Sequence, residues 1–376
     1  MRVLLIDQFS ELGGAQRGLL EAAEGFAARG WGLHAAIPEG PLVERLQHLG
    51  SGVSVIPCGP YQSVTKTISD GFRFASQFRY QAAVIADIVG TQGIDVLYVN
   101  GPRPLPPAAW ARRGRPLVFH SHSVVTQATA AALAGRSLRW ADAHVLASSE
   151  FVASWLRPFV PQPRLHVVYN GIRKVPAPRT RGSYRRIGVL GRIAPEKGQL
   201  TFVRAARIAA ESEPDLTFTI AGAPIFGSQA YMDQVRSEAG PRVSFLDWTE
   251  NIGEFFAGID ILVVPSEAVD ANPRVIPEAY SAGVPVIAFD SGGVGELLGH
   301  NETGILVKEH SARALAASMI DAVRNPQELD CMAEKGYQRW SERYTLPRFQ
   351  SEVCDALTRA VDAREPLARA RASAST

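Results

Sequence analysis

This 376-residue chain has little cysteine, little lysine and almost no net charge. Its three cysteines, Cys58, Cys331 and Cys354, are too few and too widely spaced for a disulfide framework or a zinc site, so a reducing, cytoplasmic setting is expected. The 39 basic and 37 acidic residues give a net charge of +2, which argues against a protein built to bind nucleic acid. No apolar run approaches the roughly 20 residues of a membrane span, so any membrane contact is expected to be peripheral.

The near-zero net charge conceals a difference between the two halves. Residues 1–180 hold 18 basic and 11 acidic residues, a net of +7, whereas residues 181–376 hold 21 and 26, a net of −5. Opposite signs suggest two domains with different roles. The basic half has two interpretations: a surface that faces an anionic partner or membrane, or a chance distribution of surface charge.

Short apolar runs alternate with helical segments, a pattern typical of parallel sheets covered by helices on both faces. One series starts at Val3–Ile6 and a second at Ile187–Leu190, with a segment rich in proline, glycine and arginine between them. The sequence therefore predicts an α/β fold of two doubly wound, Rossmann-like domains that bind ligands in the cleft between them. The predicted parts are an N-terminal domain (1–175), a C-terminal domain (176–345), a helix that crosses back to the first domain (346–362) and a disordered tail (363–376).

Gly13 and Gly14 follow the first predicted strand and precede a helix, where glycine lets backbone N–H groups approach an anion. Because the G-x-G-x-x-G spacing of a dinucleotide site is missing, a plain strand–helix turn is the alternative.

The second domain's first strand leads into G-R-I-A-P-E-K-G (191–198), in which Arg192 and Lys197 flank a turn. Two cations at the carboxyl end of a parallel strand suit a diphosphate, which arginine can bind in a bidentate way. Lysine is scarce, with five residues in the chain, which favours a functional Lys197 over a solvent-exposed turn.

The segment 263–296 is richest in candidate ligand-binding residues. Asp270 and Glu278 are eight positions apart, and a helix is predicted to start near Pro273 or Arg274, where free N–H groups can hold phosphate or sugar oxygens. A carboxylate such as Glu278 suits vicinal sugar hydroxyls. The alternative for each acid is a solvent-exposed or helix N-terminal charge.

Together these motifs resemble the retaining glycosyltransferases of the GT-B fold in glycosyltransferase family 4. The resemblance spans nearly the whole chain and rests on Gly13-Gly14, N-G-I (170–172), G-R-x4-K-G (191–198), the acidic-x7-Glu segment and G-G-x2-E (292–296). It implies a nucleotide-sugar donor held mainly by the C-terminal domain, an acceptor held mainly by the N-terminal domain, and no metal or other cofactor.

The resemblance also implies roles for single residues. Arg192 and Lys197 would neutralise the donor diphosphate, and Glu278 would hold the ribose. Asp270 would lie near the transferred sugar where the family usually has Glu, so a different sugar, a shifted backbone and weakened catalysis all stay open. Further donor contacts are implied for Gly14, Gly191, Pro273, Arg274 and Val275.

The family's N-domain histidine corresponds best to His122 in P-L-V-F-H-S-H-S (116–123), with His120 as the alternative. We expect the two rings to point to opposite faces, so that one of them reaches the acceptor side, where Gly13 also lies.

The predicted function is metal-independent, retaining transfer of a hexose from a UDP- or GDP-sugar to a glycan, lipid-linked or small-molecule acceptor. The expected setting is cell-envelope polysaccharide or glycoconjugate synthesis in the cytoplasm, at the inner face of the membrane. A GT-B-type epimerase or phosphorylase, and a catalytically weakened nucleotide-sugar-binding protein, are the alternatives. The basic, aromatic segment 61–81 predicts either contact with an anionic leaflet or an ordinary amphipathic helix packed on the sheet.

Overall fold

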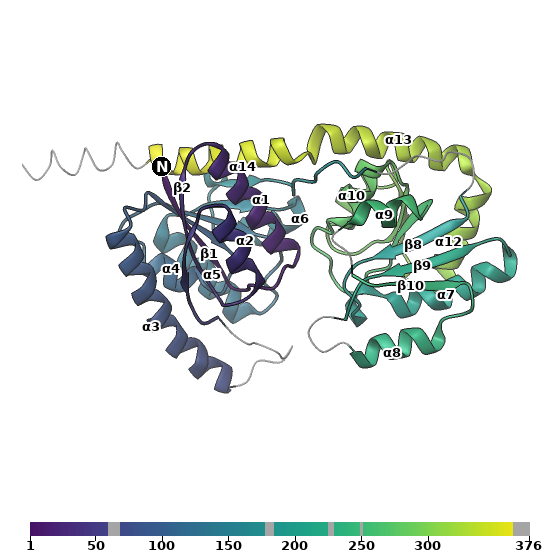
Figure 1. Cartoon of the computed structure of the whole chain (residues 1–376), viewed down its shortest axis with the longest axis horizontal. Helices are drawn as coiled ribbons and strands as arrows, with labels where there is room; N and C mark the ends of the chain where they lie inside the picture. The colour runs from purple at the N-terminus through teal and green to yellow at the C-terminus, as the bar shows by residue number, and fades with distance from the viewer. Residues whose placement is uncertain (59–67, 177–183, 225–228, 249–250, 364–376) are drawn as a thin grey trace, which may run out of the picture. The chain divides into compact units, whose positions relative to one another are not determined.

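The computed structural model describes residues 1–58, 68–176, 184–224, 229–248 and 251–363 (Figure 1). The chain divides into unit 1, which is Met1–Gly171 together with the segment from Leu346 onward, and unit 2, which is Ile172–Thr345. The predicted tail lies outside the described residues from residue 364 onward.

The described residues of unit 1 form a sheet of seven parallel strands in the order β3-β2-β1-β4-β5-β6-β7. The strands are β1 Arg2–Asp7, β2 Gly32–Ile37, β3 Gly52–Val55, β4 Val96–Asn100, β5 Leu117–Ser121, β6 His144–Ala147 and β7 Leu165–Val167. The helices are α1 Gly14–Ala28, α2 Pro41–His48, α3 Ile68–Thr91, α4 Leu105–Ala111, α5 Ala128–Ala141, α6 Glu150–Leu156 and α14 Leu346–Asp362.

The described residues of unit 2 form a sheet of six parallel strands in the order β10-β9-β8-β11-β12-β13. The strands are β8 Arg186–Leu190, β9 Thr217–Ala221, β10 Val243–Leu246, β11 Ile261–Val264, β12 Val286–Phe289 and β13 Ile305–Val307. The helices are α7 Gln199–Ser212, α8 Gln229–Glu238, α9 Ile252–Ala257, α10 Val275–Ala282, α11 Val294–Leu297, α12 Ala312–Arg324 and α13 Pro326–Arg343. Two doubly wound parallel sheets confirm the predicted fold class.

Helix α14 follows unit 2 in the chain but completes the core of unit 1, beside α1 (Figure 1). Gly25 of α1 allows this close packing, because a Cβ there would lie 2.9 Å from the Cβ of Gln350. An ion pair of 3.0 Å between Arg29 and Asp355 adds to the same contact. Buried side chains recur four residues apart on α14, at Phe349, Val353 and Leu357, and so line one face of the helix.

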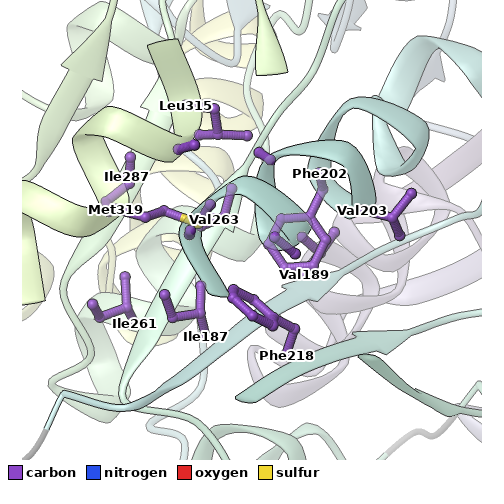
Figure 2. Packing of buried hydrophobic residues seen from close by; sticks show 14 of the residues in the cluster. Ile187, Val189, Phe202, Val203, Phe218, Ile261, Val263, Ile287, Leu315 and Met319 are labelled. Carbon is purple, nitrogen blue, oxygen red and sulfur yellow. The ribbon is translucent and has the colours of Figure 1, made fainter. Parts of the chain in front are cut away.

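The core of unit 2 lies between its sheet and helices α7 and α12 (Figure 2). Residues two apart in a strand share a face, so alternate residues of each strand supply one side of this core. The strands contribute Ile187, Val189, Phe218, Ile261, Val263 and Ile287, and the helices contribute Phe202, Val203, Leu315 and Met319.

In each sheet the strand order reverses between two neighbouring strands, β1 and β4 in unit 1 and β8 and β11 in unit 2. Ligands of open α/β sheets bind at such a switch point, outside the carboxyl ends of the strands. Strands β1 and β4 end at Asp7 and Asn100, which are partners in the strand register. The residues after β8 and β11 belong to the two loops in which the donor-site candidates were predicted.

Candidate functional site

Lys197 and Asp270 meet at the switch point of unit 2, although 73 residues separate them in the chain. The Nζ atom of Lys197 donates to Oδ2 of Asp270 at 2.5 Å, and the two side chains are 31% and 13% exposed. Ser266 donates its hydroxyl to the same oxygen at 3.0 Å. Because an ammonium has three N–H donors, Lys197 can hold Asp270 and an anionic ligand together.

Two glycines let the loops that hold this pair pack backbone against backbone. At Gly198, where φ is +70°, a Cβ would lie 1.9 Å from the carbonyl oxygen of Pro265, just after β11. At Gly292, where φ is +60°, a Cβ would lie 2.5 Å from the carbonyl oxygen of Asp270. These contacts fix the loop of Lys197 and the loop of Asp270 in position, and only glycine fits either place without a shift of the backbone.

Arg192 lies in the same loop as Lys197, with its side chain directed at Glu196. Its Nη2 atom is 2.5 Å from Oε1 of Glu196, and both side chains are partly exposed. The buried Gln199 donates its amide N–H to the Arg192 carbonyl oxygen at 2.9 Å. The loop therefore presents two cations, each already partnered by a carboxylate.

Glu278 lies in the first turn of α10 and is 7% exposed. The helix begins at Val275 after the N-cap Arg274, next to the predicted start, and Pro273 before it is buried. The N–H groups of a first helical turn have no partners within the helix, and the helix dipole favours an anion there. In this turn the Ile276 N–H donates to the Pro273 carbonyl at 3.2 Å and the Glu278 N–H donates to the Arg274 carbonyl at 3.1 Å, while Pro277 has no N–H. The start of α10 thus offers the positive end of its dipole and the Glu278 carboxylate close together in the chain.

A cavity of about 440 Å³ lies between α8 and the residues that follow β9 and β10. Gly222 in its wall packs on the loop after β8, because a Cβ on Gly222 would lie 1.9 Å from the carbonyl oxygen of Gly191. One wall residue of the cavity, Gly222, therefore contacts the start of the loop that contains both cations. Its lining is Gly222, Ala223, Pro224, Gln229, Met232, Asp233, Arg236 and Asp247.

A chain of hydrogen bonds crosses the switch point of unit 1. Asn100 donates Nδ2–H to Oδ2 of Asp7 at 2.5 Å, and its Oδ1 lies 2.7 Å from Nε2 of His122. Asp7 and Asn100 are buried, whereas His122 is partly exposed. The same Asn100 amide donates to the Ala15 carbonyl at 3.2 Å, in the first turn of α1. Gly13 is the N-cap of this helix and Gly14 is its first residue.

The expectation that His120 and His122 point to opposite faces is wrong. Their ring centroids are 4.1 Å apart, because side chains two residues apart along an extended segment lie on the same face. The rings differ in burial instead. His120 is fully buried, its Nδ1 is 2.5 Å from the Tyr98 hydroxyl, and burial with the neighbouring His122 places its pKa well below the usual range.

Burial of Asp7 raises the pKa of its carboxyl from 3.8 to about 6, against the lowering effect of hydrogen bonds from Asn100, Phe9, Gln16 and Gln8. We expect its carboxyl carbon to titrate by NMR with a midpoint near pH 6, and Asp7→Asn to remove that resonance. A pKa raised in the folded state contributes stability that is complete below about pH 4 and is lost as the pH rises through 6. By the size of the shift that loss is about 3 kcal/mol. A midpoint near 4 would contradict this prediction.

Sequence reasoning missed Asn100, Ser266 and Ser291 as site residues. Ser291 accepts from the Asp270 backbone N–H at 3.3 Å and donates to the Ala268 carbonyl at 2.6 Å, which braces the Asp270 loop. Asn100 had a usable signal, because it is a polar residue directly after an apolar run, at the end of β4. The two serines had none, since serine is common in any loop.

Two further predictions concern surfaces and metals. Residues 61–67 lie outside the described residues, and the rest of the segment 61–81 belongs to α3, which packs against α4 and exposes Phe72 and Tyr80 (75% and 54%). Helices in the described part of the chain all fall short, in length or apolar character, of what a membrane crossing requires. Across the same residues, His, Cys, Asp and Glu side chains form no group of three suited to a metal ion.

Comparison with known families decides the relationship. Residues 12–174 match the model described as Glycosyltransferase Family 4, and residues 184–325 match the one described as Glycosyl transferases group 1. The chain belongs to glycosyltransferase family 4. The 191–296 loops of unit 2 fall within the matched residues, as do Asn100 and His122 at the switch point of unit 1, whereas Asp7 precedes the match.

Individual relatives of this family-4 chain differ in the share of the chain that aligns with them. The Bacillus subtilis protein YtcC is 29% identical over 147 residues, which are 37% of this chain and 36% of that protein, so the match spans about a third of its length. The phosphatidyl-myo-inositol mannosyltransferase of Mycobacterium leprae is 27% identical over 335 residues, 84% of this chain and 85% of that protein. The crystal structure of Anabaena HepE with UDP-glucose has a TM-score of 0.77 at 22% identity, covers 95% of this chain and 99% of HepE, and shows the shared GT-B fold.

Proposed function

We propose that the chain transfers a hexose, with retention of configuration, from a UDP- or GDP-sugar to a glycan, lipid-linked or small-molecule acceptor. The observation that supports this most is the meeting of Lys197 with Asp270 at the switch point of unit 2. A cation for the leaving diphosphate and an acid for sugar hydroxyls lie at one point, which is what a nucleotide-sugar donor requires.

Charge stabilisation is the main chemical task in this proposal. As the bond between the sugar and the diphosphate breaks, negative charge builds on the leaving group, and prepositioned cations lower the energy of that state. Lys197 would direct its remaining N–H donors to the diphosphate while it stays beside Asp270, and Arg192 would open from Glu196 toward the same group. Together with the positive end of the α10 dipole, they would neutralise the charge with no metal ion assigned to the step.

The remaining groups of unit 2 would orient the donor. Glu278 would accept hydrogen bonds from the ribose hydroxyls, and the adjoining cavity would take the base. Asp270 would hold hydroxyls of the transferred sugar. With no carboxylate assigned as nucleophile, retention implies attack by the acceptor on the face that the leaving group vacates, through an oxocarbenium-like state.

Unit 1 would bind the acceptor in this proposal. The M. leprae relative is named for transfer to phosphatidyl-myo-inositol, which supports a lipid-linked acceptor. The exposed aromatic rings of α3, Phe72 and Tyr80, support peripheral contact with an anionic membrane at the cytoplasmic face.

A panel of UDP, GDP and ADP with their hexose conjugates tests the donor class. We expect a UDP or GDP ligand to raise the melting temperature, and its sugar to release the nucleoside diphosphate when acceptor is present. Glu278→Gln should weaken binding about tenfold, through the loss of a charged acceptor for the ribose. Glu342→Gln, on the exposed surface of α13, is the matched control. Failure of every nucleoside diphosphate to bind would contradict the proposal.

A further inference from the structure

The side-chain amide of Asn100 has one possible orientation in this structure. Its Nδ2 faces two acceptors, Oδ2 of Asp7 at 2.5 Å and the Ala15 carbonyl at 3.2 Å. Turning the amide over would place Oδ1 against both oxygens, and acceptors that face each other repel. The Oδ1 atom must therefore face His122, where it can only accept a hydrogen bond.

Asp7 is the origin of this orientation. It is fully buried at the end of β1, and four donors converge on its carboxylate. Asn100 donates to Oδ2, the Phe9 N–H at 2.9 Å and Gln16 Nε2 at 3.0 Å donate to Oδ1, and the Gln8 backbone N–H is the fourth donor. Each of these atoms is a donor in the orientation given, so the group acts as a pure acceptor. Because Asp7 accepts from the amide nitrogen of Asn100, the amide oxygen of Asn100 faces the His122 ring, with 2.7 Å between Oδ1 and Nε2.

We propose that Asp7 and Asn100 are positioning residues that hold the neutral His122 ring in its Nε2–H tautomer, with the lone pair on Nδ1. This inference rests on the proposed function, in which unit 1 binds the acceptor, and it takes His122 as the polar group that unit 1 contributes there. It adds which ring nitrogen carries the proton, and which buried residues decide it.

The test reverses the donor and acceptor order of the hydrogen bonds from Asp7 through Asn100 to His122, and then restores it. In Asp7→Asn the carboxylate becomes an amide, whose oxygen stays with the Phe9 and Gln16 donors, so that its N–H faces Asn100. The shorter of the two contacts that hold Asn100 Nδ2 then becomes repulsive and only the 3.2 Å contact to the Ala15 carbonyl opposes the turn, so we expect a turned-over Asn100 amide. Asn100 then offers N–H to Nε2 of His122, which moves the ring proton to Nδ1. In the double variant Asp7→Asn/Asn100→Asp, the carboxylate at position 100 accepts from both neighbours and returns the proton to Nε2.

Long-range proton–nitrogen NMR of histidine-labelled full-length protein reads the tautomer directly, near pH 8 where an ordinary imidazole is neutral. His122→Gln assigns the signal. We expect Nε2–H in the wild type, Nδ1–H in Asp7→Asn and Nε2–H again in the double variant. For transfer, kcat should fall at least about tenfold in the single variant and recover in the double variant, with the KM for the donor little changed.

A wild-type His122 in the Nδ1–H form overturns the inference without any variant, so the test survives a variant that does not fold. A folded Asp7→Asn protein that keeps both its tautomer and its kcat overturns it as well, and so does a folded double variant that keeps the Nδ1–H form. Absence of transfer with every donor would count against the proposed function instead, because the tautomer is measured without turnover.

Discussion

Lys197→Ala is expected to reduce kcat for transfer by about 100- to 1000-fold, with a smaller rise in the KM for the donor. The lysine ammonium would stabilise charge that develops on the leaving diphosphate, so its loss raises the barrier more than it weakens ground-state binding. Release of nucleoside diphosphate under saturating donor and acceptor measures the effect.

The control for this variant is Lys335→Ala, which removes another exposed lysine from unit 2, on α13. It should leave turnover unchanged. Because Asp270 is 13% exposed and loses its partner in Lys197→Ala, melting temperatures of both variants separate a loss of folding from a loss of chemistry. A folded Lys197→Ala protein with wild-type turnover would contradict the assigned role.

Gly198→Ala is expected to destabilise unit 2 by about 3 kcal/mol and to abolish most transfer. The residue adopts a left-handed φ of +70°, and its new Cβ would lie 1.9 Å from the Pro265 carbonyl oxygen, so the loop must move away from β11. Lys197, the preceding residue, would then lose its position beside Asp270. Chemical denaturation and the same nucleotide-release assay measure the two effects.

Gly240→Ala is the matched control, because a Cβ at Gly240 meets nothing within 4 Å and its backbone is not left-handed. It should change the free energy of unfolding by less than about 0.5 kcal/mol. Equal effects of the two alanines would show that packing of the 191–198 loop on Pro265 does not limit stability.

The alternation of strands and helices was readable from the sequence because buried parallel strands are continuous apolar runs. The two loops of the donor site were predictable for the same reason, since each follows such a run. The contact between Lys197 and Asp270 was not, because strand order, and therefore which loops become neighbours, is not written in local spacing.

The unit 1 network shows a second limit. Asp7 and Asn100 are 93 residues apart, and nothing near either residue predicts the other. The pairing follows from the insertion of β1 next to β4 in the sheet. The histidine error had a different origin: the pattern was sufficient, but the period of an extended chain was misapplied to residues two apart.

The return of α14 to unit 1 has a consequence for how the chain folds during synthesis. All of unit 2 lies between Gly171 and Leu346, so the ribosome makes unit 2 before it makes the helix that closes the core of unit 1. Until Phe349, Val353 and Leu357 emerge, the part of the apolar face of the unit 1 sheet that α14 covers, over β4, β5 and β6, stays exposed. Unit 1 therefore begins synthesis first but completes its fold last. A chaperone would protect this protein while unit 1 still lacks α14.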